Sequence, residues 1–297
     1  MWTKHATWQG LPVDPAVTRC EDGAMNEVSA FYTGPGQLLA AISSALDAAG
    51  VDRSALRPAD LGAVDEFHIR GRRATLEIIE ALGLTADSQV LDLGSGLGGP
   101  ARTLAEMTGC TVTGVDLTPE FCQVATALSE WTGLSGRTRF HVGDATATGL
   151  PDESVDAAMT VHVAMNIPDK HALYAEAFRV LRPAGRLVVY DVLQGEGGEV
   201  HYPVPWAADP STSFPATLED MRRLLPSAGF DVISEVDSSD ESLSWFQHMR
   251  AKIQREGPAP VTFATFLGDS FAQMAANQVA NLAERRIRTV MFVCSRP

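Results

Sequence analysis

Short apolar runs alternate with amphipathic segments along most of the chain. Runs of strand length lie at 90–93, 110–116, 138–142, 155–161, 187–192 and 230–236, and a last one lies within 286–297. Between them, apolar residues recur with helical spacing at 72–82, 170–181 and 217–228, and further helices are expected from Pro100 and from Pro119. Strands and helices that alternate in this order predict an α/β fold with a mostly parallel sheet.

The pattern changes at both ends of the chain. An amphipathic helix is expected at 37–49, and two helical stretches at 240–255 and 263–284 separate the sixth strand from the last. Insertions of this length usually carry a function, such as a lid or a subunit contact. We therefore predict four parts: an N-terminal helical lid (1–60), a Rossmann-like core (61–237), a helical insertion acting as cap or oligomer contact (238–285), and the last core strand (286–297).

The most informative motif is the glycine-rich loop after the first predicted strand. Gly94, Gly96 and Gly99 fit the spacing G-x-G-x-x-G, which is typical of dinucleotide-binding loops. Glycine suits a turn that needs unusual backbone angles and that a ligand approaches closely. Asp92 disfavours a dinucleotide, because its carboxylate would lie near the pyrophosphate at the helix N-terminus. The same carboxylate suits S-adenosylmethionine (SAM), which carries an ammonium and a sulfonium group.

Further strand ends carry the signals of one family. Asp116 ends the second predicted strand, Asp144 follows the third, and residues 181–185 have the pattern L-x-P-x-G before the fifth. Together with the glycine-rich loop, this order resembles the class I SAM-dependent methyltransferases, in particular bacterial small-molecule enzymes of the sarcosine/dimethylglycine N-methyltransferase and phosphoethanolamine methyltransferase kinds. The resemblance implies a seven-stranded, mostly parallel sheet, with SAM as the cofactor and S-adenosylhomocysteine as its product.

The resemblance also assigns the cofactor contacts. Asp116 would hold both ribose hydroxyls of SAM, and Asp144 would receive the adenine amino group. Each has a structural alternative, Asp116 as the cap of the next helix and Asp144 as the support of a turn. Their places at successive carboxyl ends of parallel strands favour ligand binding. The expected cofactor-binding residues are Asp92, Gly94, Ser95, Gly96, Gly99, Asp116, Leu117, Asp144, Ala145, Val161, Arg70 and Gly71.

The methyl acceptor is expected just past the fourth strand. His162 is our first catalytic candidate there, because a neutral imidazole can orient an acceptor or take its proton near physiological pH. Tyr32, Glu66 and His68 are the other catalytic candidates, since similar segments before the core reach the donor methyl in related enzymes. The structural alternatives stay open: His162 as an ordinary strand-end residue, and Tyr32 as a staple of the helix that follows it.

Substrate contacts are expected from Asn166, Tyr202, Trp206 and Trp245. Prolines in the segment 201–207 should hold its aromatic residues in an extended conformation, as a substrate wall or as a packed surface strap. The segment 194–199 is expected to be a flexible, exposed loop. Asn166 stands where phosphoethanolamine methyltransferases carry a catalytic His, which argues against a phosphobase substrate.

The composition is that of a globular enzyme. The 297 residues are 45% hydrophobic, and 37 acidic against 23 basic residues give a net charge of −14, which repels a nucleic-acid backbone. Neither a membrane span nor a secretory signal is apparent, so we expect a cytoplasmic protein. The Ala-, Gly- and Arg-rich composition with few Lys fits a bacterium. The spacing of Cys20, Cys110, Cys122 and Cys294 suggests reduced thiols and no metal site.

The function predicted from these features is SAM-dependent methyl transfer to nitrogen or carbon of a small molecule, such as an aromatic or indole-type intermediate of secondary metabolism. Its partner is the small-molecule acceptor, and a homo-oligomer is left open. Three alternatives remain: an NAD-dependent oxidoreductase using the same loop, an O-methyltransferase of a phenolic metabolite, and a SAM-binding regulatory protein without catalysis.

Overall fold

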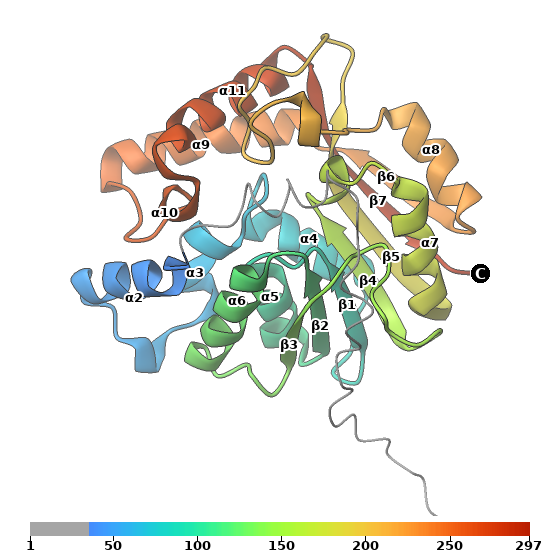
Figure 1. The fold of residues 1–297 in the computed structure, drawn as a ribbon, viewed down its shortest axis with the longest axis horizontal. Helices are drawn as coiled ribbons and strands as arrows, with labels where there is room; N and C mark the ends of the chain where they lie inside the picture. Colours follow the sequence, from blue (N-terminus) through green and yellow to red (C-terminus); the bar gives the residue numbers. More distant parts are fainter. Residues whose placement is uncertain (1–35) are drawn as a thin grey trace, which may run out of the picture.

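The computed structural model describes residues 36–297, which are built on one seven-stranded sheet with the order β3-β2-β1-β4-β5-β7-β6 (Figure 1). The first five strands pair in parallel, and β7 runs antiparallel to both β5 and β6. This confirms the predicted seven-stranded, mostly parallel sheet. The strands are β1 (Gln89–Leu93), β2 (Thr111–Asp116), β3 (Thr138–Val142), β4 (Val155–Val161), β5 (Leu181–Gln194), β6 (Asp231–Asp237) and β7 (Ile287–Ser295).

Helices cover both faces of the sheet because each carries an apolar stripe. On one face, α4 (Arg72–Leu82) and α5 (Gly99–Thr108) bury residues such as Ile78 and Leu104, and α6 (Pro119–Trp131) packs along β3. On the other face, α7 (Lys170–Val180) and α8 (Leu218–Ser227) bury residues such as Leu173 and Leu225. Both cores are made of aliphatic side chains that the sheet strands share with these helices.

Two predicted boundaries were wrong. The fifth strand begins at Leu181 instead of residue 187, because Leu181 pairs with Val155 and the Ala184 N–H donates to the Arg296 carbonyl. The single helix expected at 263–284 is three elements, α10 (Ala264–Leu267), η4 (Gly268–Ser270) and α11 (Phe271–Ala283). The break lies at Gly268, whose φ of +63° is left-handed.

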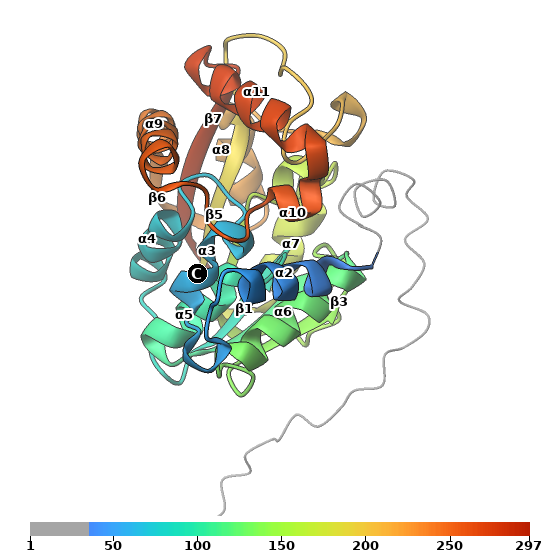
Figure 2. The same cartoon turned by 90° about the vertical axis from the view of Figure 1, so that its left-hand side faces the viewer.

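The insertion lies at the edge of the sheet where the parallel strands end. The helix α9 (Ser239–Glu256) follows the carboxyl end of β6, and α11 leads back into β7 at the same edge (Figure 1). The helix α2 (Leu38–Ala48) lies beside α6 and α10 (Figure 2), and it buries Ile42 in a cluster with Leu128. Shorter elements are η1 (Arg53–Ala55), α3 (Pro58–Asp65), η2 (Ala164–Asn166) and η3 (Pro210–Thr212). None of the described helices is long and apolar enough to cross a membrane.

Candidate active site

A cavity lies at the carboxyl ends of β1, β2 and β4, where a parallel α/β sheet binds its ligands. It encloses about 930 Å³ of space, part of it open to solvent. Most of the predicted cofactor and catalytic residues line it directly, together with Asn166 from the predicted substrate set. Those that line it are His68, Asp92, Gly94, Ser95, Gly96, Asp116, Leu117, Ala145, Val161 and the first catalytic candidate, His162.

Most glycines of the loop serve packing within the protein. A Cβ on Gly94 would lie 2.3 Å from a methyl of Val163, and a Cβ on Gly99 would lie 2.3 Å from the Asp65 carbonyl oxygen. A Cβ on Gly96 would meet nothing within 4 Å, and Gly96 lines the cavity. Gly96 is therefore the loop position that the protein leaves open for a ligand, whereas Gly99 does not line the cavity at all.

The end of β2 is joined to this open position by a carboxylate. Asp116 accepts hydrogen bonds from the backbone N–H of Gly96 through Oδ2 at 2.8 Å, and from that of Thr118 through Oδ1 at 2.9 Å. Burial raises the pKa of Asp116, and these two N–H groups oppose the rise. Oδ1 therefore supports the start of the next helix, as the structural alternative expected, while Oδ2 holds the glycine-rich loop at Gly96.

A second buried carboxylate has a vacant oxygen. Asp92, near the end of β1, is 1% exposed, and its Oδ2 has no hydrogen-bond partner within residues 36–297. Burial raises the pKa of Asp92 to about 8, and the neighbouring carboxylates of Asp116 and Glu66 add to the rise. A buried carboxyl without a partner is costly, so this atom is a strong candidate for contact with a cationic ligand group.

Asp144 makes the turn contacts of its structural alternative. Its Oδ1 accepts hydrogen bonds from the backbone N–H and the hydroxyl of Thr146, and Asp144 does not line the cavity. Its neighbours Gly143 and Ala145 do. The turn therefore faces the cavity on either side of Asp144.

The segment before α4 divides into residues at the cavity and residues behind it. Glu66 is buried, and its two oxygens accept hydrogen bonds from the hydroxyls of Thr75 at 2.6 Å and Thr103 at 2.9 Å. Burial raises the pKa of Glu66, and these hydroxyls oppose the rise. Glu66 does not line the cavity. Its Oε2 lies 3.6 Å from Nε2 of His68, so Glu66 supports this histidine from behind the cavity wall.

Arg70 and Gly71, two of the expected cofactor-binding residues, have partners within the protein. The Arg70 guanidinium pairs with Glu77, and the Gly71 N–H donates to the carbonyl of His68. Neither residue lines the cavity. Gly71 has a φ of +45° and lies directly before α4, so the glycine is needed for the turn into this helix.

His162 follows β4 directly, with a left-handed φ of +55° that is unusual for a residue with a Cβ. Its backbone N–H donates to the Tyr190 carbonyl at 2.8 Å. Burial lowers the pKa of His162 well below its usual range, and His68 adds to the effect. The imidazole is therefore neutral at physiological pH, and this favours orientation of an acceptor over the uptake of its proton.

Asn166 lines the cavity four residues later. Its Nδ2 donates to the carbonyls of Trp206 at 2.9 Å and Thr212 at 2.8 Å, which leaves Oδ1 as the group for a ligand. Trp206 is buried, and its indole N–H donates to Ser213 Oγ at 2.9 Å. Asn166 thus joins the cavity to the segment 201–207.

The other predicted substrate residues do not line the cavity. Val204 and Ala207 form a hydrogen-bonded turn around the buried Trp206, so the expected extended conformation was wrong. Tyr202 packs against the same apolar cluster, and Trp245 lies on α9 beside Gly71. The catalytic candidate Tyr32 lies outside the described residues.

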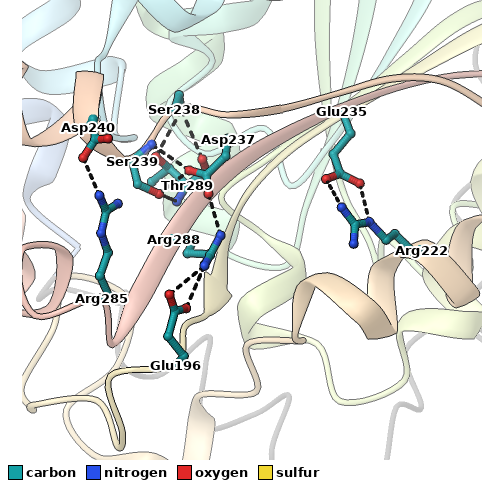
Figure 3. A network of polar contacts seen from close by, with 10 residues as sticks. All are labelled: Glu196, Arg222, Glu235, Asp237, Ser238, Ser239, Asp240, Arg285, Arg288 and Thr289. Carbon is teal, nitrogen blue, oxygen red and sulfur yellow. Dashed lines mark hydrogen bonds and ion pairs between the residues drawn. The ribbon is translucent and has the colours of Figure 1, made fainter.

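The loop 194–199 is tied down instead of being free. The Gly195 N–H donates to the Arg286 carbonyl and the Gly197 N–H to the Arg285 carbonyl, each at 2.8 Å. Glu196 forms an ion pair with Arg288 of β7 at 2.7 Å (Figure 3). The glycine and charge content of the segment predicted a flexible loop. The prediction missed these contacts because the partner residues lie about ninety positions later in the sequence.

Sequence reasoning missed three aromatic residues around the site. Phe67 and Phe121 line the cavity, and the ring of Tyr190 on β5 lies 5.0 Å from that of His162. Tyr190 occupies an apolar strand, where the pattern predicts only burial. Phe67 lies between the candidates Glu66 and His68 in the sequence, and this position was the one signal that could have placed Phe67 at the site.

The charge around the cavity is one-sided. In the part of the chain that the structure describes, the acidic residues lining it are Asp65, Asp92 and Asp116, with no Lys or Arg among the lining residues. Asp65 is paired with the buried Arg102 at 2.7 Å. The two imidazoles at its edge are neutral, since burial also lowers the pKa of His68 to about 4. Within residues 36–297 no cluster of His, Cys, Asp and Glu side chains is arranged as a metal site. The cavity suits a ligand with positive charge.

Comparison with known proteins agrees with this geometry. Residues 91–189 match the family model described as a methyltransferase domain. Methyltransferase GfsG of Streptomyces halstedii is 34% identical over 45% of this chain and 48% of its own length, and the sterol 24-C-methyltransferase erg-4 of Neurospora crassa is 28% identical over 56% and 46%. The chain therefore spans about half the length of the curated relatives it matches.

A solved structure extends the likeness to nearly the whole chain. The geranyl diphosphate C-methyltransferase of Streptomyces coelicolor has a TM-score of 0.68 at 16% identity, over 95% of this chain and all of that one. Such a likeness concerns the fold. Residues 91–189 match the methyltransferase-domain model, and the seven-stranded sheet has the fold of the methyltransferase structures it resembles.

Proposed function

We propose that this chain, with its class I methyltransferase domain, transfers the methyl group of SAM to nitrogen or carbon of an uncharged small molecule. The observation that carries the proposal is the pairing, in one cavity, of the open loop at Gly96 with the carboxylates of Asp92 and Asp116. The oxidoreductase alternative loses its support, because the matched domain is a methyltransferase domain and Asp92 disfavours a pyrophosphate.

The residues present fit SAM by their chemistry. Asp116 has the position to hold the ribose hydroxyls next to the Gly96 backbone, and the vacant Oδ2 of Asp92 suits the cationic part. When bound, SAM supplies a methyl group on a positively charged sulfur, which a nucleophile displaces in line. The protein contributes by holding the acceptor in line and excluding water, which account for much of the rate in such reactions.

The charge of the site favours an uncharged acceptor over an anionic one. Geranyl diphosphate, on which the Streptomyces coelicolor enzyme acts, carries two phosphates, and that complex also holds Mg²⁺; such groups are usually held by Arg, Lys or a metal ion. No Lys or Arg lines the described cavity, and no cluster of His, Cys, Asp and Glu within residues 36–297 is arranged as a metal site. Residues 1–35 contain only Lys4 and Arg19 against four acidic residues. A lining of carboxyl groups without Lys or Arg gives no compensation for the charge of a buried phosphate, in agreement with the expectation drawn from Asn166.

The apolar side chains around the histidines suit a substrate with an aromatic or hydrocarbon part. Phe67, Val163 and Ile167 line the cavity next to His162. An aromatic or indole-type intermediate of a biosynthetic pathway fits this lining, and the sterol and geranyl enzymes show C-methylation among similar proteins.

We further propose that two segments outside the sheet close this site. The Leu38 N–H of α2 donates to Glu120 of α6 at 2.8 Å, next to the cavity residue Phe121. The insertion 238–285 lies at the same edge of the sheet. These contacts support a lid over 1–60 and a cap over 238–285, because a reaction at a sulfonium centre needs water excluded.

Methyl transfer can be tested with a panel of candidate acceptors. The purified chain is incubated with SAM carrying a deuterated methyl group and with matched neutral acceptors, including indoles, amines, phenols and geraniol. Mass spectrometry should find S-adenosylhomocysteine and a labelled product, and its fragmentation locates the methyl on N, C or O. Calorimetry with SAM and with NAD serves as the control. Binding of NAD in preference to SAM would overturn the proposal.

A further inference from the structure

Two buried imidazoles lie together in the wall of the cavity. The ring centroids of His68 and His162 are 6.0 Å apart with the rings near perpendicular, and both residues line the cavity. They come from distant parts of the chain, His68 from the turn before α4 and His162 from the end of β4. Their meeting is therefore a product of the fold and is invisible in either local motif.

The hydrogen bonds of His68 define its tautomer. Its Nε2 lies 3.0 Å from the Gly71 carbonyl oxygen, which can only accept, so Nε2 carries the proton. Nδ1 is then an unprotonated acceptor, and it makes no hydrogen bond to any residue in 36–297. Thr75, 3.3 Å from Nε2, donates its own proton to Glu66. His68 thus offers one lone pair to whatever occupies the cavity.

His162 has unused hydrogen-bonding capacity too. Its Nε2 is buried and has no partner in the described chain, and no hydrogen bond of its ring forms within residues 36–297. Its backbone conformation is held in the left-handed region by the N–H bond to the Tyr190 carbonyl. A strained backbone and an unsatisfied imidazole in one residue are features of a binding position.

Tyr190 is the residue that touches both rings. Its own ring lies 5.0 Å from that of His162 and 6.3 Å from that of His68. Its hydroxyl donates to the Ile69 carbonyl at 3.2 Å, next to His68 in the chain. Tyr190 therefore fixes the turn that carries one imidazole and packs against the other.

Polar residues of β7 and of the start of α9 surround the Tyr190 hydroxyl. Burial raises the pKa of Tyr190, and the hydroxyls of Ser238, Ser242 and Thr289 oppose this rise. Ser238 and Thr289 belong to the network in Figure 3, where Arg288 of β7 bonds to Asp237 at 2.8 Å and Ser239 bonds to Asp237 and Thr289. This network joins β7 to the start of α9 and keeps the hydroxyl cluster in place.

We propose that His68 and His162 form an uncharged subsite that receives an O–H or N–H group of the methyl acceptor, with Tyr190 as the residue that positions both rings. This proposal rests on the proposed function for the identity of the bound molecule. A neutral imidazole pair accepts a hydrogen bond from a neutral hydroxyl, amine or indole, and it gives no compensation for a buried phosphate. The acceptor class is thus an uncharged alcohol, phenol, amine or indole.

The first test observes the imidazoles directly. The full chain, labelled with ¹⁵N and saturated with S-adenosylhomocysteine, is titrated with phenol and, separately, with phenyl phosphate. Long-range ¹H–¹⁵N spectra should show His68 protonated at Nε2, and phenol should shift the signals of both His68 and His162 while exposed His201 stays unchanged. Phenyl phosphate should bind at least tenfold more weakly. Equal or tighter binding of phenyl phosphate, or phenol leaving both signals in place, would overturn the subsite.

The second test compares two buried tyrosines. Tyr190→Phe keeps the ring and removes the hydroxyl, and it should displace the His68 and His162 signals and weaken phenol binding at least fivefold with S-adenosylhomocysteine affinity unchanged. Tyr174→Phe is the matched control, because Tyr174 is equally buried on α7 and contacts Met221 instead. Identical spectra for Tyr190→Phe and the unmodified chain would remove Tyr190 from the proposal. A chain that fails to bind S-adenosylhomocysteine but shows the phenol shifts would contradict the proposed function alone.

Discussion

The Asp116 carboxylate, at the end of β2, accepts the backbone N–H of Gly96 at 2.8 Å, so one side chain joins two strand ends across the glycine-rich loop. Asp116 thereby has two tasks, to hold the loop and to present charge to a ligand. Two substitutions separate them.

Asp116→Ala should weaken SAM binding by one to two decades, because a lost charge-assisted hydrogen bond costs about 1.5–3 kcal/mol. Asp116→Asn retains an oxygen for the Gly96 N–H and should recover the stability of the loop but little of the affinity. Calorimetry with SAM and urea unfolding measure the two effects, with exposed Asp269→Asn as the control. Unchanged SAM affinity in a folded Asp116→Ala variant would contradict the cofactor assignment.

Asp92→Asn should stabilise the protein without ligand, and more so as the pH rises. The folded-state pKa of Asp92 is about 8 and its ordinary value is 3.8, so the folded state binds the proton more tightly and loses stability as pH rises from about 4 to 8. Asparagine removes this loss, and the gap between the proteins should widen by at most about 1.4 kcal/mol per pH unit. Urea unfolding at pH 5, 6, 7 and 8 measures it. A constant gap would mean that Asp92 is ionised in the folded state throughout this range, which would contradict the raised pKa. In a separate measurement at pH 8, the SAM affinity of the variant should fall at least tenfold.

Gly94 and Gly96 should respond differently to alanine although both have positive φ. Gly94→Ala drives a methyl group into Val163 and should cost about 2–5 kcal/mol of stability. Gly96→Ala meets no protein atom and should cost only about 1–2 kcal/mol, but it should obstruct SAM. The double variant Gly94→Ala/Val163→Ala should recover part of the lost stability. Equal stability of the two single variants would refute this account of the loop.

If the cavity residue His162 orients the acceptor as proposed, His162→Ala should lower kcat about 100-fold with the true acceptor while SAM affinity changes less than threefold. Steady-state kinetics and calorimetry measure the two quantities. His201→Ala, which removes an exposed imidazole paired with Glu284, is the control. A near-normal rate in the variant would return His162 to a structural role.

SAM should slow amide hydrogen exchange in α2 and in the preceding segment 31–36, if these residues cover the cofactor. The Leu38 amide is the most direct reporter, since it bonds to Glu120 beside the cavity. Exchange in α8, on the opposite face of the sheet, should be unaffected. Equal exchange in α2 with and without SAM would contradict the lid.

The sheet and the strand-end residues could be predicted because they depend on local pattern. Strand length, the turn glycines and the placing of Asp92 and Asp116 at strand ends follow from chain order, and parallel strands bring those ends together. The same reasoning could not tell Asp116, which faces the loop, from Asp144, whose Oδ1 is used by Thr146 two residues later.

The rest of the site depends on partners far apart in the sequence. Arg70 has the residue type of a ligand contact, but Glu77 binds it, and Trp206 is enclosed by Ser213 and the apolar cluster instead of facing a substrate. Tyr190 gave no signal, since an aromatic residue in a buried strand fits packing equally well. Residue type predicted which groups could do chemistry, and only the fold decided which of them face the cavity.

The place of β7 between β5 and β6 has a consequence for synthesis. The strand β6 has no partner in the sheet until residues 287–295 have been made, and one edge of β5 stays open for as long. At roughly 5–20 residues per second, the ribosome needs on the order of 5–20 s to pass from the end of β5 to the start of β7. During that time the apolar edge at Val188 and Val189 is free to pair with another nascent chain. A chaperone that binds this stretch, or fast translation through the insertion, would therefore shorten the time for which the edge is open to such pairing.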